Sequence, residues 1–224
     1  MNNAVPLLAA LLAATAAAVR APRWRNPVSR PLTLGVALLA VWALLRAPAV
    51  NRWGDDLTTS ATQLERLPGL IADVSLVAAG VLLAIAVAQA WGRSGLIRAA
   101  YSALAAVEVV LLATYDPFDA PEWVLTAQKW IIAGAVTLGS AAIFAAACIT
   151  YRALPSRLRL PMAVFMLGGL LGVTVGIVRG VVLLLPDVHL GDSWAVLGSL
   201  PVYAFAIGSL IAAARTRHAT TTEK

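Results

Sequence analysis

Long apolar runs, each close to 20 residues, recur along this chain from its first residues almost to its last. A helix needs about 20 mostly apolar residues to cross the roughly 30 Å hydrocarbon core of a bilayer. Only 12% of the residues are charged, about half of the roughly 25% found in a soluble domain. No stretch between the runs reaches the ~50 residues that an independent soluble domain needs. The sequence therefore predicts a polytopic, all-α transmembrane helix bundle.

The apolar runs predict seven membrane spans, which together form one transmembrane domain over residues 1–214. The spans are Ala4–Val19, Leu32–Val50, Leu70–Trp91, Ala99–Tyr115, Val124–Tyr151, Met162–Leu185 and Ala195–Ala214. Residues 215–224 form a short polar tail. The ends of the first two spans are the least well defined, because the first span is short and the second contains Arg46 near its end.

The charged residues outside the spans divide into two groups. Connections 20–31, 92–98 and 152–160, with the tail from Arg215, hold twelve basic residues, against three in the alternate connections. Eight acidic residues fall in those alternate connections, and Glu223 alone falls with the basic group. Because cytoplasmic loops carry the excess of Lys and Arg, we expect a protein of the cell membrane with its N-terminus outside the cell and its C-terminus in the cytoplasm. The cytoplasmic basic residues are then placed to contact anionic lipids.

Besides Arg46 near the end of the second span, four ionisable residues lie inside the predicted spans. They are Asp73, Glu108, Lys129 and Arg179. At ~1.5 Å per helical residue, all four lie roughly 5–10 Å below the predicted outer ends of their spans. A charge in hydrocarbon costs several kcal/mol, so each of these groups needs a partner, water or access to the interface. We interpret the four residues as a candidate binding or gating cluster.

Small residues line the faces of two spans that carry these charges. Gly168, Gly172, Gly176 and Gly180 form a ridge on the sixth span, and Gly80 and Ala84 lie on the third. Such small-residue faces allow close approach of a neighbouring helix. At 100° per residue, Arg179 points toward the ridge and Asp73 toward Gly80 and Ala84. The third and sixth spans are therefore expected to pack closely, and the ridge is also a candidate surface for oligomer assembly.

The positions suggest that Asp73 or Glu108 pairs with Arg179, with Lys129 nearby. Two alternatives stay open. A buried ion pair also serves as a static lock of helix register without any further role. Lys129 and Arg179 have side chains long enough to reach the headgroup region from these depths.

The sequence carries no recognisable catalytic, phosphate-binding or metal-binding motif. The sequence has no GxxxxGK[ST] phosphate loop and no HExxH helix. His189 and His218 fall on opposite sides of the predicted membrane, and Cys148 is the single cysteine. We therefore expect no enzyme activity, no cofactor and no metal site. The net charge of +6 is explained by the topology of the loops rather than by nucleic-acid binding.

Three stretches resemble a family of actinobacterial integral membrane proteins that also occurs in their phages and prophages. The stretches are "NPVSRPLTLGVALLAVWALLRAPAV", "LPGLIADVSLVAAGVLLAIAVAQAW" and "LGGLLGVTVGIVRGVVLLL". The resemblance implies about seven spans and, because some members carry the label of transporter, a role in transport. It implies no catalytic residues.

Two classes of function agree with these observations. In the first, the bundle moves or senses a small solute or ion through the cluster of Asp73, Glu108, Lys129 and Arg179. In the second, the chain is a non-catalytic membrane partner, such as a regulator, a signalling subunit or a phage-encoded exclusion factor, that acts through helix–helix assembly. A polar cavity that reaches the charged cluster favours the first class, and a glycine ridge facing lipid favours the second.

Overall fold

The computed structural model describes residues 3–27, 29–90, 94–115, 121–185, 188 and 193–221, without the side chains of residues 90, 94, 96, 157 and 216–221. All regular structure over these residues is helical, which confirms the all-α class. The helices are α1 (Ala4–Arg20), the 3₁₀ helix η1 (Ala21–Arg23), α2 (Ser29–Arg46), α3 (Pro48–Thr62), α4 (Leu67–Ala90), α5 (Ser94–Ala113), α6 (Glu122–Ala153), α7 (Ser156–Leu183) and α8 (Ser193–Thr221).

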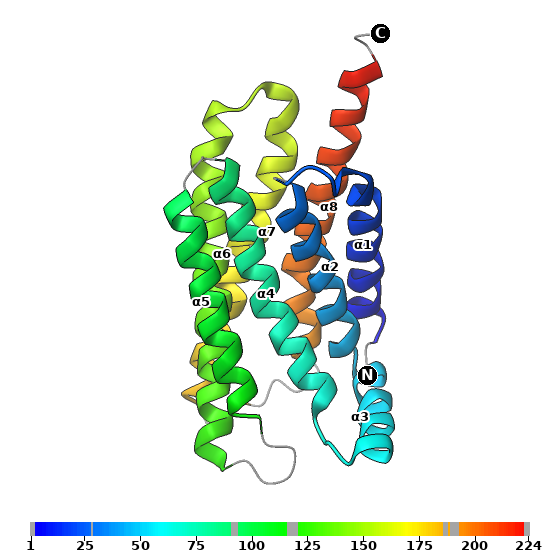
Figure 1. Cartoon of the computed structure of the whole chain (residues 1–224), viewed down its shortest axis with the longest axis vertical. Helices are drawn as coiled ribbons and strands as arrows, with labels where there is room; N and C mark the ends of the chain where they lie inside the picture. Colours follow the sequence, from blue (N-terminus) through cyan, green and yellow to red (C-terminus); the bar gives the residue numbers. More distant parts are fainter. Residues whose placement is uncertain are drawn as a thin grey trace.

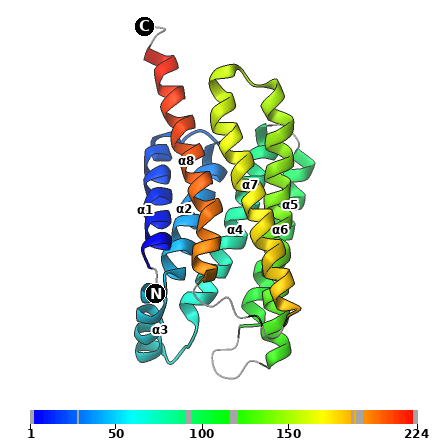
Figure 2. The same cartoon turned by 180° about the vertical axis from the view of Figure 1, so that it is seen from behind.

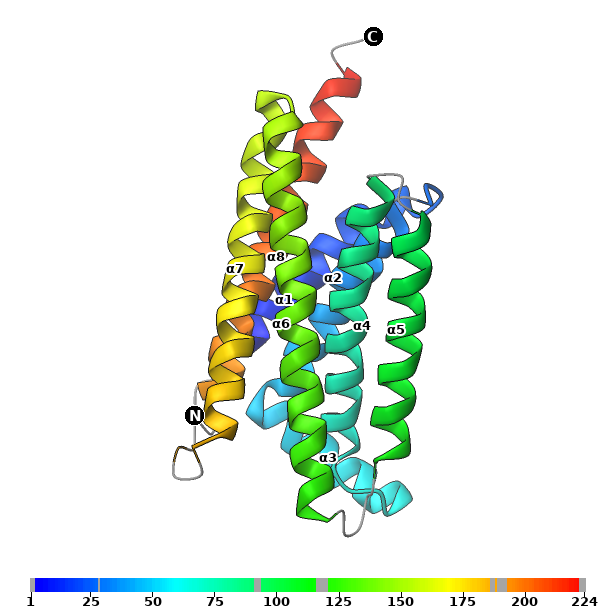
Figure 3. The ribbon, with the colours of Figure 1, turned by 90° about the vertical axis from the view of Figure 1, so that its left-hand side faces the viewer.

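Six long helices form a closed ring, and a seventh lies outside it. Around the ring, α1 packs against α2, α2 against α4, α4 against α6, α6 against α7, α7 against α8, and α8 against α1 (Figures 1 and 2). α5 packs mainly against α4 and lies at the edge of the bundle (Figure 3). The main core cluster draws chiefly on α1, α2, α4 and α8, with Ile143 of α6.

Alanines account for the close packing of α1. Ala9, Ala13 and Ala16 recur at three- and four-residue intervals, and none of the three is exposed. Residues at this spacing share one face of a helix. A face of methyl groups lets the neighbouring backbones come close without large side chains between them. The short first span is thereby held against α2 and α8.

α2 ends at Arg46, so the predicted second span, which ran to Val50, was too long. Ala47 is extended, with φ −64° and ψ 122°. A residue that precedes proline is pushed out of the helical region, and Pro48 then occupies the first turn of α3, where its missing N–H costs nothing. The continuous apolar run hid this break.

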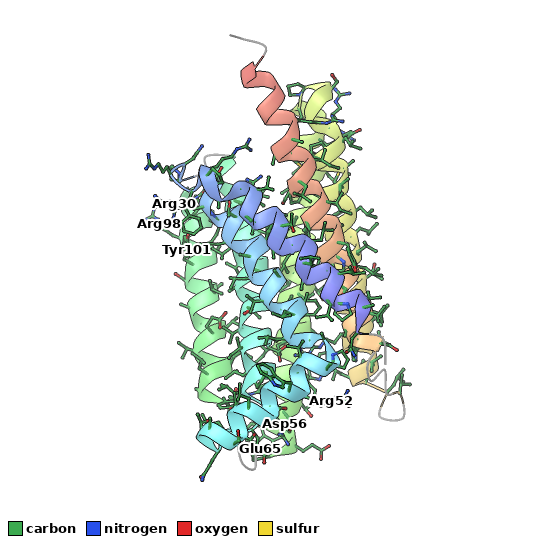
Figure 4. The ribbon with its side chains drawn as sticks, turned by 90° about the vertical axis from the view of Figure 1, so that its right-hand side faces the viewer. Arg30, Arg52, Asp56, Glu65, Arg98 and Tyr101 are labelled. Carbon is green, nitrogen blue, oxygen red and sulfur yellow. The ribbon has the colours of Figure 1, made fainter. Side chains whose placement is uncertain are left out.

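α3 is an amphipathic helix that the sequence analysis did not identify. Figure 4 shows α3 crossing the end of the bundle obliquely, on the side of Arg52, Asp56 and Glu65. Trp53 and Leu57, one turn apart, are 65% and 52% exposed. A helix with an exposed apolar stripe beside polar residues is typical of a segment that lies in the membrane interface.

The glycine ridge of α7 packs against α6 and α8, not against α4 as predicted from the spacing. A methyl group on Gly172 or Gly176 would collide with Ser140 or Thr137 of α6, and one on Gly168 would lie 2.9 Å from the Phe205 ring of α8. Small residues on α6 provide the complementary face. Gly80 of α4 likewise packs against α6 rather than α7. A methyl group added to Gly139 of α6 would lie 3.7 Å from the Cα of Gly80.

Six helices among the described residues are long and apolar enough to cross a membrane: α1, α2, α4, α6, α7 and α8. This agrees with an integral membrane protein. α5, with 20 residues, is not among the six, although it runs alongside α4 (Figure 3). The seventh span and the orientation therefore stay predictions. The predicted end of the third span at Trp91 lies outside the described residues.

Candidate functional site

An ion pair joins the end of α2 to the second turn of α4. Arg46 Nη2 donates a hydrogen bond to Asp73 Oδ1. Both side chains are largely covered, with 32% and 18% of their surfaces exposed. α2 and α4 pack along their lengths, so the last residue of one helix lies at the height of an early residue of the other. The charge-assisted hydrogen bond partly offsets the cost of removing the two charges from water.

A cavity of about 150 Å³ is lined by both members of this ion pair, and we call it the charged cavity. Its polar lining consists of Arg46, Arg66, Asp73, Tyr115 and Gln128. Leu70, Leu111, Leu125 and Ile132 supply most of its apolar wall. The volume is large enough for several water molecules, each of which takes about 30 Å³ in the liquid. The charged cavity thus has room for water or a small solute and has an ion pair in its lining.

Hydrogen bonds tie the walls of the charged cavity together. The Tyr115 hydroxyl donates to the carbonyl of Glu65 at 2.6 Å. Gln128 Nε2 donates to the carbonyl and to the hydroxyl of Thr114, both at 2.8 Å. These bonds connect the end of α5 to the segment before α4 and to the first turns of α6. Three segments therefore hold the cavity: the segment before α4, the end of α5 and the first turns of α6.

Arg179 lies close enough to the ion pair to share its electrostatics. The side chain is half-buried near the end of α7. Its guanidinium carbon is 6.0 Å from the centre of the Trp194 ring on α8, a cation–π geometry. The charge of Asp73 attracts the guanidinium and the charge of Arg46 repels it. Asp73 is thus the acidic group for two arginines, although it forms its ion pair with Arg46.

The other two predicted cluster residues lie elsewhere. Lys129 is exposed on α6, as a side chain that reaches toward the headgroup region would be. Glu108 lies on α5, and both its carboxylate oxygens are buried without a hydrogen-bond partner among the described residues. The structure therefore brings Asp73 and Arg179 near one another, adds Arg46, and leaves Glu108 and Lys129 apart.

The sequence did not indicate Arg46 as the partner of Asp73. Arg46 lies near the end of the predicted second span, and Arg179 was the cation expected to pair with Asp73 or Glu108. Helical periodicity gives the direction of a side chain around its own helix but not the identity of the neighbouring helix. The available signal was that Arg46 and Asp73 both lie near the same ends of consecutive predicted spans.

A second, smaller cavity of about 40 Å³ lies inside the ring, and we call it the central cavity. It is mostly apolar and is bordered by residues of α2, α4, α6, α7 and α8. Small residues and a proline are prominent in its wall: Gly80, Ser140, Gly172, Gly198 and Pro201. Ala84, predicted to share the face of Gly80, is half-buried and is not part of this wall.

The two cavities follow one another along the interface of α4 and α6. On α4 the charged cavity reaches Asp73 and the central cavity begins at Leu76. On α6 the corresponding residues are Ile132 and Ala135. Three residues of helix rise separate the cavities, about 4.5 Å. The side chains of about one helical turn therefore separate the two cavities.

No three His, Cys, Asp or Glu side chains of the described residues come together in a way that would hold a metal ion. His189 lies outside the described residues, and so does the side chain of His218. Comparison with family models, curated proteins and solved structures finds no match for this chain. The resemblance to the actinobacterial membrane family stays a prediction. The charged cavity is the feature of the structure that bears on function.

Proposed function

We propose that this chain is an integral membrane protein that binds a small anionic solute or ion in the charged cavity and passes it across the membrane. The observation that supports this proposal is the excess of cationic over acidic side chains in the lining of the charged cavity. Arg46 and Arg66 are the cations of this lining, and Asp73 is its acidic residue. Arg66 has no ion-pair partner among the described residues.

The electrostatics of the charged cavity favour an anion. Among the residues that line the cavity, Asp73 is paired with Arg46, so Arg66 gives the lining a net positive charge. Asp55, which does not line the cavity, interacts electrostatically with Tyr115 at its edge. A guanidinium offers several N–H donors in a plane, which suits carboxylates and oxyanions. The half-buried Arg179 adds a further cation within electrostatic reach of the ion pair. An anion entering the cavity thus meets positive potential in surroundings that screen it less than bulk water does.

The central cavity supports passage rather than binding alone. It continues the line of the charged cavity and is separated from it by the side chains of about one helical turn. Pro201 inside α8 removes one backbone hydrogen bond and loosens the helix at the cavity wall. A helix that bends there changes the contacts that separate the two cavities. Alternating closure of this kind is how transporters expose one site to two sides.

The alternative function, a membrane partner that assembles through the glycine ridge, receives no support from the ridge. Gly168, Gly172 and Gly176 are buried against α6 and α8 within the single chain. Those positions already have the close helix contact that such a ridge makes possible.

Uptake by proteoliposomes tests the proposal. Purified protein is reconstituted and the uptake of chloride, nitrate, phosphate and lactate is measured against liposomes without protein. We expect uptake of at least one anion and a loss of about tenfold or more in Arg66→Gln, since a hydrogen bond to a charged group contributes ~1.5–3 kcal/mol.

Arg52→Gln is the matched control, because Arg52 is an arginine of α3 that does not line the charged cavity. It should retain wild-type uptake. The proposal is wrong if no anion enters faster than into empty liposomes, or if Arg66→Gln and Arg52→Gln transport equally well.

A further inference from the structure

Among the described residues, Glu108 is an acidic side chain on the packed face of α5 that does not line the charged cavity. Both its carboxylate oxygens are buried by protein atoms and have no hydrogen-bond partner among the described residues. On α5 it shares a face with Leu104 and Leu111, which lie four residues before it and three after it. That face belongs to an apolar cluster with Val77 of α4 and Ile132 of α6.

No charged group in the described chain is placed to neutralise Glu108. α4, against which α5 packs, has Asp73 as its single ionisable residue, and Arg46 holds that carboxylate. The residues that α4 and α6 contribute to the cluster are all apolar. Lys129 of α6 is exposed, and Arg98 and Tyr101 of α5 lie toward the opposite end of the bundle (Figure 4).

An ionised carboxylate in such surroundings is costly, whereas a neutral carboxylic acid is tolerated. We infer that Glu108 is a proton-binding site within the membrane, and that its proton accompanies the anion of the charged cavity. Protonation adds one H⁺ to a carboxylate oxygen and removes one negative charge. A proton and a monovalent anion together carry no net charge through the apolar part of the bundle.

The position of Glu108 favours this coupling. Leu111 lines the charged cavity, and Glu108 lies three residues deeper, about 4.5 Å along the helix. α5 packs mainly against α4 and lies outside the ring. A movement of α5 that exposes the carboxyl to the cavity therefore leaves the ring in place and breaks the hydrogen bonds of Thr114 and Tyr115 at its end. The proton site stands on its own geometry, whereas the coupling rests on the proposed function.

Infrared spectroscopy of the protein in liposomes tests the proton site directly. At neutral pH exposed carboxyls are ionised, whereas a protonated carboxyl gives its own C=O stretching band. We expect wild-type protein to show this band, Glu108→Gln to lose it, and Glu122→Gln to keep it. Glu122 is an exposed acid at the start of α6 and serves as the matched control. Equal spectra for wild type and Glu108→Gln would overturn the proton site.

Proton uptake with a pH-sensitive dye inside the same liposomes tests the coupling. We expect each anion that enters wild-type liposomes to bring a proton, and Glu108→Gln to lose this proton uptake and any accumulation driven by a pH gradient. Anion uptake without proton movement in the wild type refutes the coupling and leaves the proposed function intact. Absence of all anion uptake removes both, and the infrared band then decides the proton site alone.

Discussion

The ion pair of Arg46 and Asp73 is the residue-scale feature on which the charged cavity depends. Each partner is the other's main compensation, since Asp73 is only 18% exposed. Removing one member of such a pair leaves a charge that is partly withdrawn from water. The neighbouring Arg179 makes the loss of Asp73 worse, because two arginines then repel each other without an acid between them.

Asp73→Asn should therefore destabilise the protein, by about 1–3 kcal/mol for a partly buried group left unsatisfied. The exchange Arg46→Asp with Asp73→Arg should recover part of this loss, because it restores an ion pair between the same two positions. The exchange Asp73→Arg with Arg179→Asp should not recover it, because Arg46 then faces a new cation. Thermal unfolding of purified protein in detergent measures all three. A wild-type melting temperature for Asp73→Asn would contradict the assignment.

The sequence was informative about single residues and less so about their neighbours. It singled out Asp73 and Arg179 as charges within apolar runs, because any charge in such a run stands out. It did not identify the Arg46–Asp73 pair, because pairing depends on which helices are adjacent. It grouped Glu108 and Lys129 with the cluster by depth alone, although their helical faces point to an apolar cluster and to the outside.

At the scale of elements, the interface of α6 and α7 is built on exchange of small groups. Ser140 and Thr137 of α6 fill the spaces left by Gly172 and Gly176 of α7. The backbones can approach this closely only because the glycines lack a Cβ. Sequence periodicity predicted the ridge but not its partner, because α4 and α6 both carry small residues.

Gly172→Ala should destabilise the bundle by roughly 1–3 kcal/mol, the usual cost of overpacking a tight interface. Gly172→Ala with Ser140→Gly should recover part of the loss, because the colliding side chain is gone. Gly134→Ala is the matched control on α6, where a methyl group meets nothing within 4 Å. It should be neutral or slightly stabilising, as alanine favours helix over glycine. The order of melting temperatures in detergent tests this, and equal values for Gly172→Ala and Gly134→Ala would contradict the interlocked interface.

At the scale of the whole molecule, the two ends of the bundle carry different charged residues. Figure 4 places Arg30 and Arg98 at one end, and Arg52, Asp56 and Glu65 at the other. The charged cavity lies near the second end, where Arg66 and Tyr115 border it. If the basic end faces the cytoplasm, the charged cavity opens outward and the central cavity lies deeper. The side of the membrane from which a solute enters the charged cavity thus depends on the orientation of the bundle.

Labelling of single cysteines in intact cells tests both the orientation and the seventh span. In a Cys148→Ala background, we expect Asp56→Cys and Glu122→Cys to react with a membrane-impermeant maleimide from outside. Arg98→Cys should react only after the membrane is permeabilised, because α5 separates it from Glu122. All three original residues are exposed, so failure to react reports the membrane rather than burial. If Arg98→Cys and Glu122→Cys react from the same side, α5 does not cross. If Arg98→Cys alone reacts from outside, the orientation is reversed and the charged cavity opens to the cytoplasm.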